Sequence, residues 1–303
     1  MVREHQFHSV DETRVFPPVL GEYHRTNLPL QRRPRNLFPG SKRSYEFHSP
    51  GSVITLIDSK AIYTRLSGNI LTHDDIQKIP LRVGYDTWFT DQILDFIFEM
   101  IRQVYRTDET GIGIIDTATG QLLSGSGDIA MQEEYREMLE DKNWIFVPIN
   151  DAYGQTDSSG QGVPGQHWSL LAIDRPNRKA HYVDSTLSSY VSYGFGMVID
   201  NIARNLGNFY REQYEVLIDV NAPNQSRHNI ARDPGACGPY VIYMVSLFVQ
   251  SMTEKIHTGN ANSIGLSLHH FAPQHFQQTF DSGKVRQQIL NTIEDYHRRS
   301  KAN

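Results

Sequence analysis

The sequence has a single cysteine, Cys237, among its 303 residues. One cysteine cannot form an intramolecular disulfide, and it cannot supply a multi-cysteine zinc or iron–sulfur site. The composition therefore excludes a disulfide-stapled secreted domain and favours a reducing compartment, so we expect the protein in the cytosol or the nucleus. Two roles are left for Cys237, which are packing in the core and chemistry.

Long hydrophobic runs and a surplus of one charge are also missing. No stretch reaches the roughly 18 apolar residues of a membrane span, and the first residues, MVREHQFHSVDETR, lack the apolar centre of a signal peptide. Lysine and arginine number 29 against 34 aspartate and glutamate, a net charge of −5. This balance gives no reason to expect a nucleic acid. We expect neither a membrane nor a nucleic acid among the partners.

Residues 1–50 differ in composition from the rest of the chain. They hold 6 of the 14 prolines, and between Arg25 and Arg43 the charged residues are all basic. Proline and arginine with little hydrophobic periodicity are typical of disorder. We predict a flexible basic arm over residues 1–50 and a folded domain over residues 51–303. The arm has two open interpretations, a solvated tail and a nuclear-import or docking patch around QRRPRNLFPGSKR.

From about residue 51 onward the patterns predict a domain that mixes helices and strands. Thr90 can cap a helix that runs to residue 105, because apolar residues recur there at helical spacing. The apolar run after Cys237 is too long for a strand, so we predict a helix that starts at the cysteine and is buried on most sides. The other predicted elements are helices within 132–142, 195–206 and 285–299, strands within 144–149, 167–174, 179–184 and 214–220, and a hairpin turn at RPNRK.

Cys237, His167 and Asp184 are the residues that carry candidate chemistry. A cysteine at the start of a helix is favoured as the thiolate, but it needs a base. His167 opens a predicted strand, and Asp184 ends the next one. Pairing across the hairpin places these two ends side by side, so Asp184 can accept a hydrogen bond from the far ring nitrogen of His167. Asp174, at the turn end of the hairpin, is expected to lie too far away.

These residues resemble the cysteine proteases of ubiquitin-like proteins, the SUMO and NEDD8 protease family. The order and the spacing of the three residues agree with that family, and the resemblance covers about residues 52–255. It implies an α+β, papain-like fold in which a mixed central sheet packs on a buried helix that starts at the nucleophile. The segments that carry the resemblance are WFTD (88–91), FVPIN (146–150), HWSLLAID (167–174), HYVDS (181–185) and CGPYVIYMV (237–245).

The resemblance implies a thiol protease that cleaves after the C-terminal Gly-Gly of a ubiquitin-like modifier. Cys237 would be the nucleophile, His167 the base and then the acid, and Asp184 the residue that orients the histidine. Trp88 and Trp168 would bind substrate by flanking a narrow tunnel, because two indoles leave room only for residues without side chains. No cofactor and no metal are implied.

The partner implied by the resemblance is the modifier itself, which would be NEDD8, SUMO or ubiquitin, together with its conjugates. The segments HWSLLAIDRPNRKAHYVDS and APNQ look somewhat closer to the deneddylase branch of the family, which favours NEDD8 slightly. We expect the protein to act as a monomer.

The sequence departs from the family pattern just before the cysteine. The family usually has a glutamine six residues before the nucleophile, where it donates to the oxyanion, but Ala231 stands there. The nearest glutamine is Gln225. We interpret RHNIARDPGA as a lengthened loop that returns Gln225 to the site, with Asn229 as the substitute donor. Loss of one such donor typically costs about 100- to 1000-fold in rate.

Two other functions stay open at this point. A displaced glutamine also fits a catalytically weak or dead module that keeps only the modifier-binding face. Bacterial effector acetyltransferases resemble the same family and reuse its three catalytic residue types. Trp88 and Trp168 argue against acetyl transfer, because a clamp for Gly-Gly has no purpose there.

Overall fold

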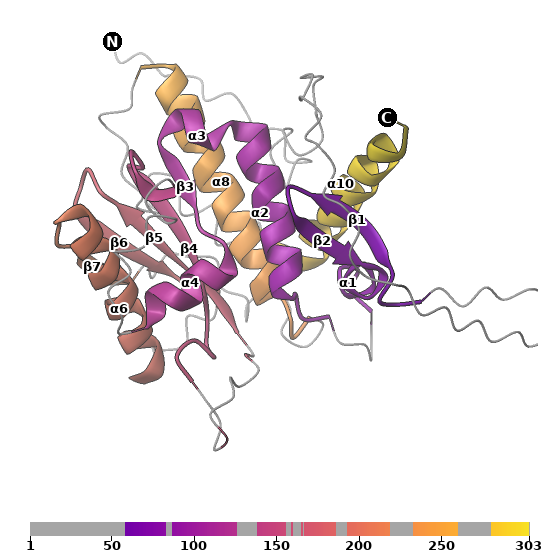
Figure 1. Ribbon diagram of the computed structural model, residues 1–303, viewed down its shortest axis with the longest axis horizontal. Coiled ribbons are helices and arrows are strands. Elements are labelled where there is room, and N and C mark those ends of the chain that lie inside the picture. The colour runs from indigo at the N-terminus through magenta and orange to yellow at the C-terminus, as the bar shows by residue number, and fades with distance from the viewer. Residues whose placement is uncertain are drawn as a thin grey trace, which may run out of the picture.

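The computed structural model describes residues 58–82, 87–125, 138–155, 159, 165, 167–185, 193–218, 233–259 and 280–302 (Figure 1). The predicted arm over residues 1–50, most of the predicted helix at 132–142, and both Gln225 and Asn229 lie outside the described residues. The elements in chain order are β1 Ile62–Leu66, β2 Asn69–Thr72, α1 His73–Lys78, α2 Asp91–Tyr105, α3 Thr107–Thr110, β3 Ile112–Ile114, α4 Thr117–Ser124, β4 Trp144–Asn150, β5 Trp168–Asp174, β6 Lys179–Val183, α6 Tyr193–Tyr210, β7 Glu215–Ile218, α8 Cys237–His257 and α10 Ser282–Ala302.

A five-stranded mixed sheet with the order β3-β4-β5-β6-β7 forms the centre of the fold. β5 pairs antiparallel to both of its neighbours, β4 and β6, whereas β3 pairs parallel to β4 and β7 pairs parallel to β6. β4 and β5 are buried along their whole length. Strands that are covered on both faces need apolar residues at nearly every position, which explains the sequences WIFVPIN and WSLLAID. The predicted strands and their hairpin are confirmed.

Helices cover both faces of this sheet. Phe146 of β4 stacks on Phe248 of α8, with ring centroids 5.7 Å apart. The next residue, Val147, approaches α4 so closely that a Cβ on Gly120 would lie 3.4 Å from Val147 Cγ1. Because neighbouring strand residues point to opposite faces, α8 lies on one side of the sheet and α4 on the other (Figure 1). α2 packs beside α8, and α6 packs beside α4.

The helix α8 begins at Cys237 and is buried at every position through Ser246. This burial explains why its sequence, GPYVIYMVSLFV, has no polar face. The prediction of an α+β fold, with a mixed sheet against a buried helix that starts at the cysteine, is confirmed.

The helix α2 begins where the sequence predicts. The Thr90 hydroxyl accepts a hydrogen bond from the backbone N–H of Ile93 at 3.4 Å, so it satisfies one of the free amides of the first turn. The cap fixes the path of the preceding residues, Trp88 and Phe89, which run past the start of α8.

A smaller layer packs against α2 and α8 and consists of β1, β2, α1 and α10. The β1–β2 hairpin holds the C-terminal helix, because Tyr296 Oη donates to the carbonyl of Arg65 at 2.9 Å. Asp75 forms a capping box with Thr72 at the start of α1 and also accepts from Thr90 Oγ1 at 3.0 Å. These bonds tie α1 to the start of α2. Among the helices of the described residues, none is long and apolar enough to span a bilayer.

Asp174 organises the turn between β5 and β6. Its Oδ1 accepts from the backbone N–H of Asn177 at 3.2 Å, and its Oδ2 accepts from Asn177 Nδ2 at 2.8 Å. The residue is 0% exposed. The sequence-based assignment of Asp174 to the turn agrees with these bonds.

Replacing Asp174 with alanine is expected to lower the free energy of unfolding by about 1–3 kcal/mol, because the turn loses the two hydrogen bonds that Asn177 donates to this carboxylate. Urea unfolding measures this loss. The rate at which iodoacetamide alkylates Cys237 should stay at the wild-type value, since the turn lies at the other end of β5 from His167. A folded variant with slow alkylation would show that Asp174 belongs to the reactive group.

Candidate active site

Cys237 is the first residue of α8, where the free amides of a helix collect positive partial charge. The cap residue, Ala236, makes no side-chain hydrogen bond to the first turn, and the first turn carries no acidic side chain. The helix end is therefore not neutralised locally. Positive partial charge beside the sulfur is typical of the surroundings of reactive cysteines.

His167 and Asp184 meet across the end of the β5–β6 hairpin. In the hairpin register Leu170 pairs with Val183, so the residue before β5 and the residue after β6 lie next to each other. The ring Nε2 of His167 and the Oδ1 of Asp184 are 2.8 Å apart. The ring of His167 also has a hydrogen bond with the side chain of Cys237. The structure thus brings together the three residues that the sequence selects.

Two further residues hold this group in place, and the sequence analysis missed both. Tyr182 Oη donates to Asp184 Oδ2 at 2.8 Å, so each oxygen of the carboxylate has a donor. The Asp151 carboxylate accepts from the backbone N–H of His167 at 3.0 Å. A period-two reading of HYVDS would have placed Tyr182 and Asp184 on one face of the strand. Asp151, which follows β4, has no comparable signal.

The surroundings of His167 favour the protonated ring. Burial of the ring lowers its pKa, but the hydrogen bonds with Asp184 and Cys237 and the negative charges of these partners raise it more, to about 10. The ring is therefore an imidazolium at neutral pH. Burial and the charge of Asp184 raise the pKa of Tyr182, so this hydroxyl stays a donor. An imidazolium beside the sulfur stabilises the thiolate.

Trp88 and Trp168 lie on two segments that are joined by one hydrogen bond. The indole Nε1 of Trp168 donates to the carbonyl of Phe89, the residue after Trp88, at 3.0 Å. Trp168 is 4% exposed, whereas Trp88 is half-buried. The ring of Tyr153 meets Trp168 edge to face, with centroids 6.4 Å apart. The hydrogen bond therefore anchors Trp168 and holds the segment that carries Trp88 at the end of the sheet where His167 lies.

A protein-family model decides what this arrangement belongs to. The model described as the Ulp1 protease family, C-terminal catalytic domain, matches residues 87–279. The chain belongs to the Ulp1 protease family. The matched range contains both tryptophans and the group of His167, Asp184 and Cys237. The chain therefore carries a Ulp1-family cysteine protease domain, and the predicted α+β, papain-like protease fold is confirmed.

Three solved structures are similar to this Ulp1-family chain and share little sequence with it. The C-terminal Ulp1 protease domain in complex with Smt3, the yeast ortholog of SUMO, is 15% identical, with a TM-score of 0.47 over 78% of this chain and 89% of that one. The Ulp1-like SUMO protease catalytic domain of Chaetomium thermophilum is 14% identical, with a TM-score of 0.44 over 78% and 84%. ChlaDub1 from Chlamydia trachomatis is 16% identical, with a TM-score of 0.39 over 69% and 94%. Curated protein sequences contain no significant match.

The catalytic and substrate-binding roles of the site residues stay predictions, and so does the side-chain oxyanion donor. Gln225 and Asn229 lie outside the described residues. The backbone amide at Cys237, at the start of α8, is the donor position that the structure describes. Within the described residues, no group of three or more His, Cys, Asp or Glu side chains could hold a metal ion.

Proposed function

We propose that this Ulp1-family domain is a thiol isopeptidase that cleaves after the C-terminal Gly-Gly of a ubiquitin-like modifier. The observation that carries the proposal is the hydrogen-bonded pair of His167 and Asp184 beside Cys237 at the start of α8. Within a cysteine protease family, this arrangement supplies a nucleophile, a proton donor and a residue that orients the donor.

In the first half of the reaction, the sulfur of Cys237 attacks the carbonyl carbon of the last glycine. The negative charge that develops on the carbonyl oxygen is stabilised by the backbone amide at the start of α8, and by Gln225 or Asn229 if the loop returns one of them. The imidazolium of His167 then gives its proton to the leaving amine. The C–N bond breaks, and a thioester joins the modifier to Cys237.

In the second half, water attacks the thioester carbonyl while neutral His167 accepts the proton of the water. The C–S bond breaks, the modifier leaves as a carboxylic acid that gives its proton to the solvent, and the thiolate and imidazolium are restored. Asp184 keeps the ring in one orientation through both halves, because its Oδ1 bonds the ring nitrogen that takes no part in the transfer.

Trp88 and Trp168 are proposed to select the substrate tail. The half-buried ring of Trp88 and the anchored ring of Trp168 belong to segments joined through the carbonyl of Phe89. A narrow passage between two indole rings has room for glycine but not for residues that carry a side chain. Gly-Gly is the sequence that such a passage admits.

A Gly-Gly tail alone does not determine which modifier is preferred. Contacts with the globular part of the modifier must discriminate between NEDD8, SUMO and ubiquitin. The segments around His167 and the APNQ segment favour NEDD8. The family takes its name from Ulp1, whose domain is known in complex with the yeast ortholog of SUMO, so SUMO fits at least as well. The proposal therefore names NEDD8 and SUMO with equal weight and places ubiquitin after them.

A panel of modifier probes tests this function. NEDD8, SUMO and ubiquitin, each with a thiol-reactive group in place of the last glycine, are incubated with the full chain and followed by intact-protein mass. We expect a one-to-one adduct that forms at least about tenfold faster with one modifier than with the others, because the correct surface orients the tail.

Two controls accompany the panel of modifier probes. Since Cys237 is the only cysteine, prior treatment with iodoacetamide must abolish the adduct. A tail peptide that carries the same reactive group without the globular modifier should react much more slowly. Reaction with none of the three modifiers would refute the proposal, and acetyl transfer from acetyl-CoA under the same conditions would favour the acetyltransferase.

A further inference from the structure

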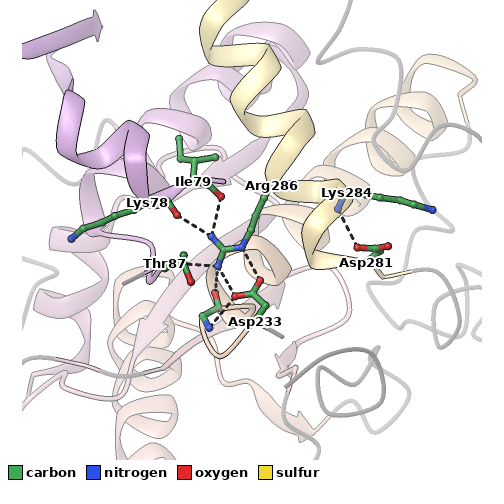
Figure 2. A network of polar contacts seen from close by, with 8 residues as sticks. Lys78, Ile79, Thr87, Asp233, Asp281, Lys284 and Arg286 are labelled. Atoms are coloured by element: carbon green, nitrogen blue, oxygen red, sulfur yellow. Dashed lines mark hydrogen bonds and ion pairs between the residues drawn. The ribbon is translucent and has the colours of Figure 1, made fainter. Parts of the chain in front are cut away.

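Arg286 of α10 is a fully buried arginine whose guanidinium joins three separate segments (Figure 2). Arg286 and its partner, Asp233, are both 0% exposed at their side chains. The Nε of Arg286 donates to Asp233 Oδ2 at 2.7 Å, and Nη2 donates to Asp233 Oδ1 at 2.9 Å. The remaining contacts are with the backbone carbonyls of Lys78 at 3.1 Å, Ile79 at 3.1 Å, Thr87 at 2.8 Å and Gly235 at 2.9 Å.

All three guanidinium nitrogens of Arg286 therefore have partners. A guanidinium has five N–H groups in one rigid plane and no acceptor. Each segment that it contacts is thus fixed in distance and in direction. Asp233 is fixed in turn, because its Oδ1 also accepts from the backbone N–H of Gly235 at 3.1 Å.

Two of the contacted segments lead directly into the candidate active site. Thr87 precedes Trp88, and Gly235 lies two residues before Cys237. The guanidinium also lies over the ring of Phe89, 4.7 Å from its centroid. Arg286 therefore binds the segment that carries one tryptophan and the segment that presents the nucleophile.

These two segments approach each other too closely for a side chain to separate them. A Cβ on Gly235 would lie 2.8 Å from the carbonyl oxygen of Thr87, and a Cβ on Gly238 would lie 2.7 Å from the Cβ of Phe89. The carbonyl of Phe89 then receives the indole N–H of Trp168, the residue after His167. A continuous set of contacts thus runs from Arg286 to both sides of the Cys237–His167 pair.

We propose that Arg286 is a positioning residue that sets the placement of Cys237 relative to His167 by holding the segments at Thr87 and Gly235 together. This inference rests on the proposed function for its importance, because a thiol protease needs the sulfur and the imidazolium in hydrogen-bond contact. Arg286 lies beyond residue 279, where the family match ends. Through the bonds of Arg286 to Thr87 and Gly235, the helix α10 contributes to the geometry of the site.

The test replaces Arg286 with lysine and measures how fast iodoacetamide alkylates Cys237 between pH 5 and 9. Lysine keeps the positive charge beside Asp233 but has three donors on one atom and no planar fork. We expect the alkylation rate at pH 6 to fall by about tenfold or more, since a small displacement of one partner weakens the thiolate–imidazolium contact. The pH profile should move toward that of the His167→Gln variant.

Arg175→Lys is the matched control, because Arg175 makes the same kinds of contact at another place, with a carboxylate, a backbone carbonyl and an aromatic ring. Its Nε and Nη2 bind both oxygens of Glu212, its Nη1 binds the carbonyl of Lys142, and its guanidinium lies over the ring of Tyr210. It follows the turn end of β5, away from His167. We expect Arg175→Lys to lower the thermal midpoint as Arg286→Lys does and to leave the alkylation profile unchanged.

Asp233→Asn is the second variant and keeps the test decisive if Arg286→Lys does not fold. It leaves the guanidinium in place but turns one acceptor of the ion pair into a donor, so the profile should move in the same direction by a smaller amount. An unchanged profile in a folded Arg286→Lys or Asp233→Asn variant would overturn the proposal. An equal shift in Arg175→Lys would overturn it too, because general loosening would then explain the effect.

Alkylation needs no modifier, so this test is independent of the proposed function. If none of the modifier probes reacts while Arg286→Lys still shifts the profile, Arg286 positions a reactive thiol and the modifier assignment is wrong. If a modifier is cleaved, the same variant should lower kcat by about tenfold or more and change KM little, since the defect lies at the reacting atoms.

Discussion

Replacing Cys237 with alanine is expected to lower turnover of the cognate modifier fusion by about 10⁴- to 10⁶-fold. No thioester can form without the sulfur, and the chain has no second cysteine to replace it. Cys237 is 1% exposed at the start of a helix, where alanine is well tolerated. The fold should therefore persist, and the variant should bind the modifier with the wild-type Kd. Steady-state cleavage of a linear modifier fusion and calorimetric titration measure the two quantities.

Cys237→Ser is the matched variant for this prediction. It keeps a hydroxyl that can share the hydrogen bond with His167, but an alcohol is a much poorer nucleophile than a thiolate near neutral pH. We expect turnover close to that of the alanine variant. Turnover within tenfold of wild type in Cys237→Ala would exclude a thiol protease altogether. A wild-type protein as slow as Cys237→Ala that still binds a modifier would identify a binding module.

Several elements are predictable from the sequence because their signals are local. The Thr90 cap and the helical spacing after it define α2, and the long apolar run after Cys237 defines α8. The short turn RPNRK joins two apolar strands and forces them to pair, which brings the residue before β5 to the residue after β6. The meeting of His167 and Asp184 follows from that register alone.

The contacts of Arg286 could not be predicted, because they depend on how distant segments pack. Within the sequence of α10, Arg286 follows Val285 and precedes Ile289 by one helical turn, so it lies on the buried face. Helical periodicity can identify Arg286 as a charged residue on an otherwise apolar helix face. It does not say which carboxylate pairs with it. Asp233 is 53 residues away and lies in a segment with no periodic pattern.

The physical reason for a glycine near the nucleophile could not be predicted from the sequence either. Gly238, the second residue of CGPYVIYMV, is recognisable as a family feature from the sequence. Its physical reason is the side chain of Phe89, which leaves no room for a Cβ. That reason becomes visible only when α8 and the segment before α2 are placed against each other.

Replacing Asp184 with asparagine is expected to lower kcat by about 10³- to 10⁴-fold while KM changes little. Asp184 Oδ1 accepts from the ring Nε2 of His167, and Tyr182 donates to the other oxygen. Asparagine offers one acceptor and one donor group where the ring and the tyrosine both need acceptors. The ring then loses either its orientation or its protonated form. Steady-state cleavage of the same modifier fusion measures the loss, and Asp174→Asn, the same change at the turn end of the hairpin, is the control.

The same substitution should change the pH dependence in a defined direction. Burial lowers the pKa of His167, and the hydrogen bond with Asp184 comes first among the interactions that raise it to about 10. Without the carboxylate, burial opposes only the partner Cys237, so the pKa of His167 should fall toward or below its usual value of about 6.5. The ring proton signals of His167, followed by NMR between pH 5 and 11, measure this shift.

The raised pKa of His167 also makes the free energy of unfolding of the wild type depend on pH. A histidine whose pKa is raised by folding adds to the free energy of unfolding fully below its unfolded pKa of about 6.5, and this contribution is lost as the pH rises through about 10. The difference in free energy of unfolding between wild type and Asp184→Asn should therefore be largest near pH 6 and shrink toward pH 10. A difference that grows over this range, or a His167 pKa that stays near 10 in the variant, would show that Asp184 does not hold the ring in its charged form.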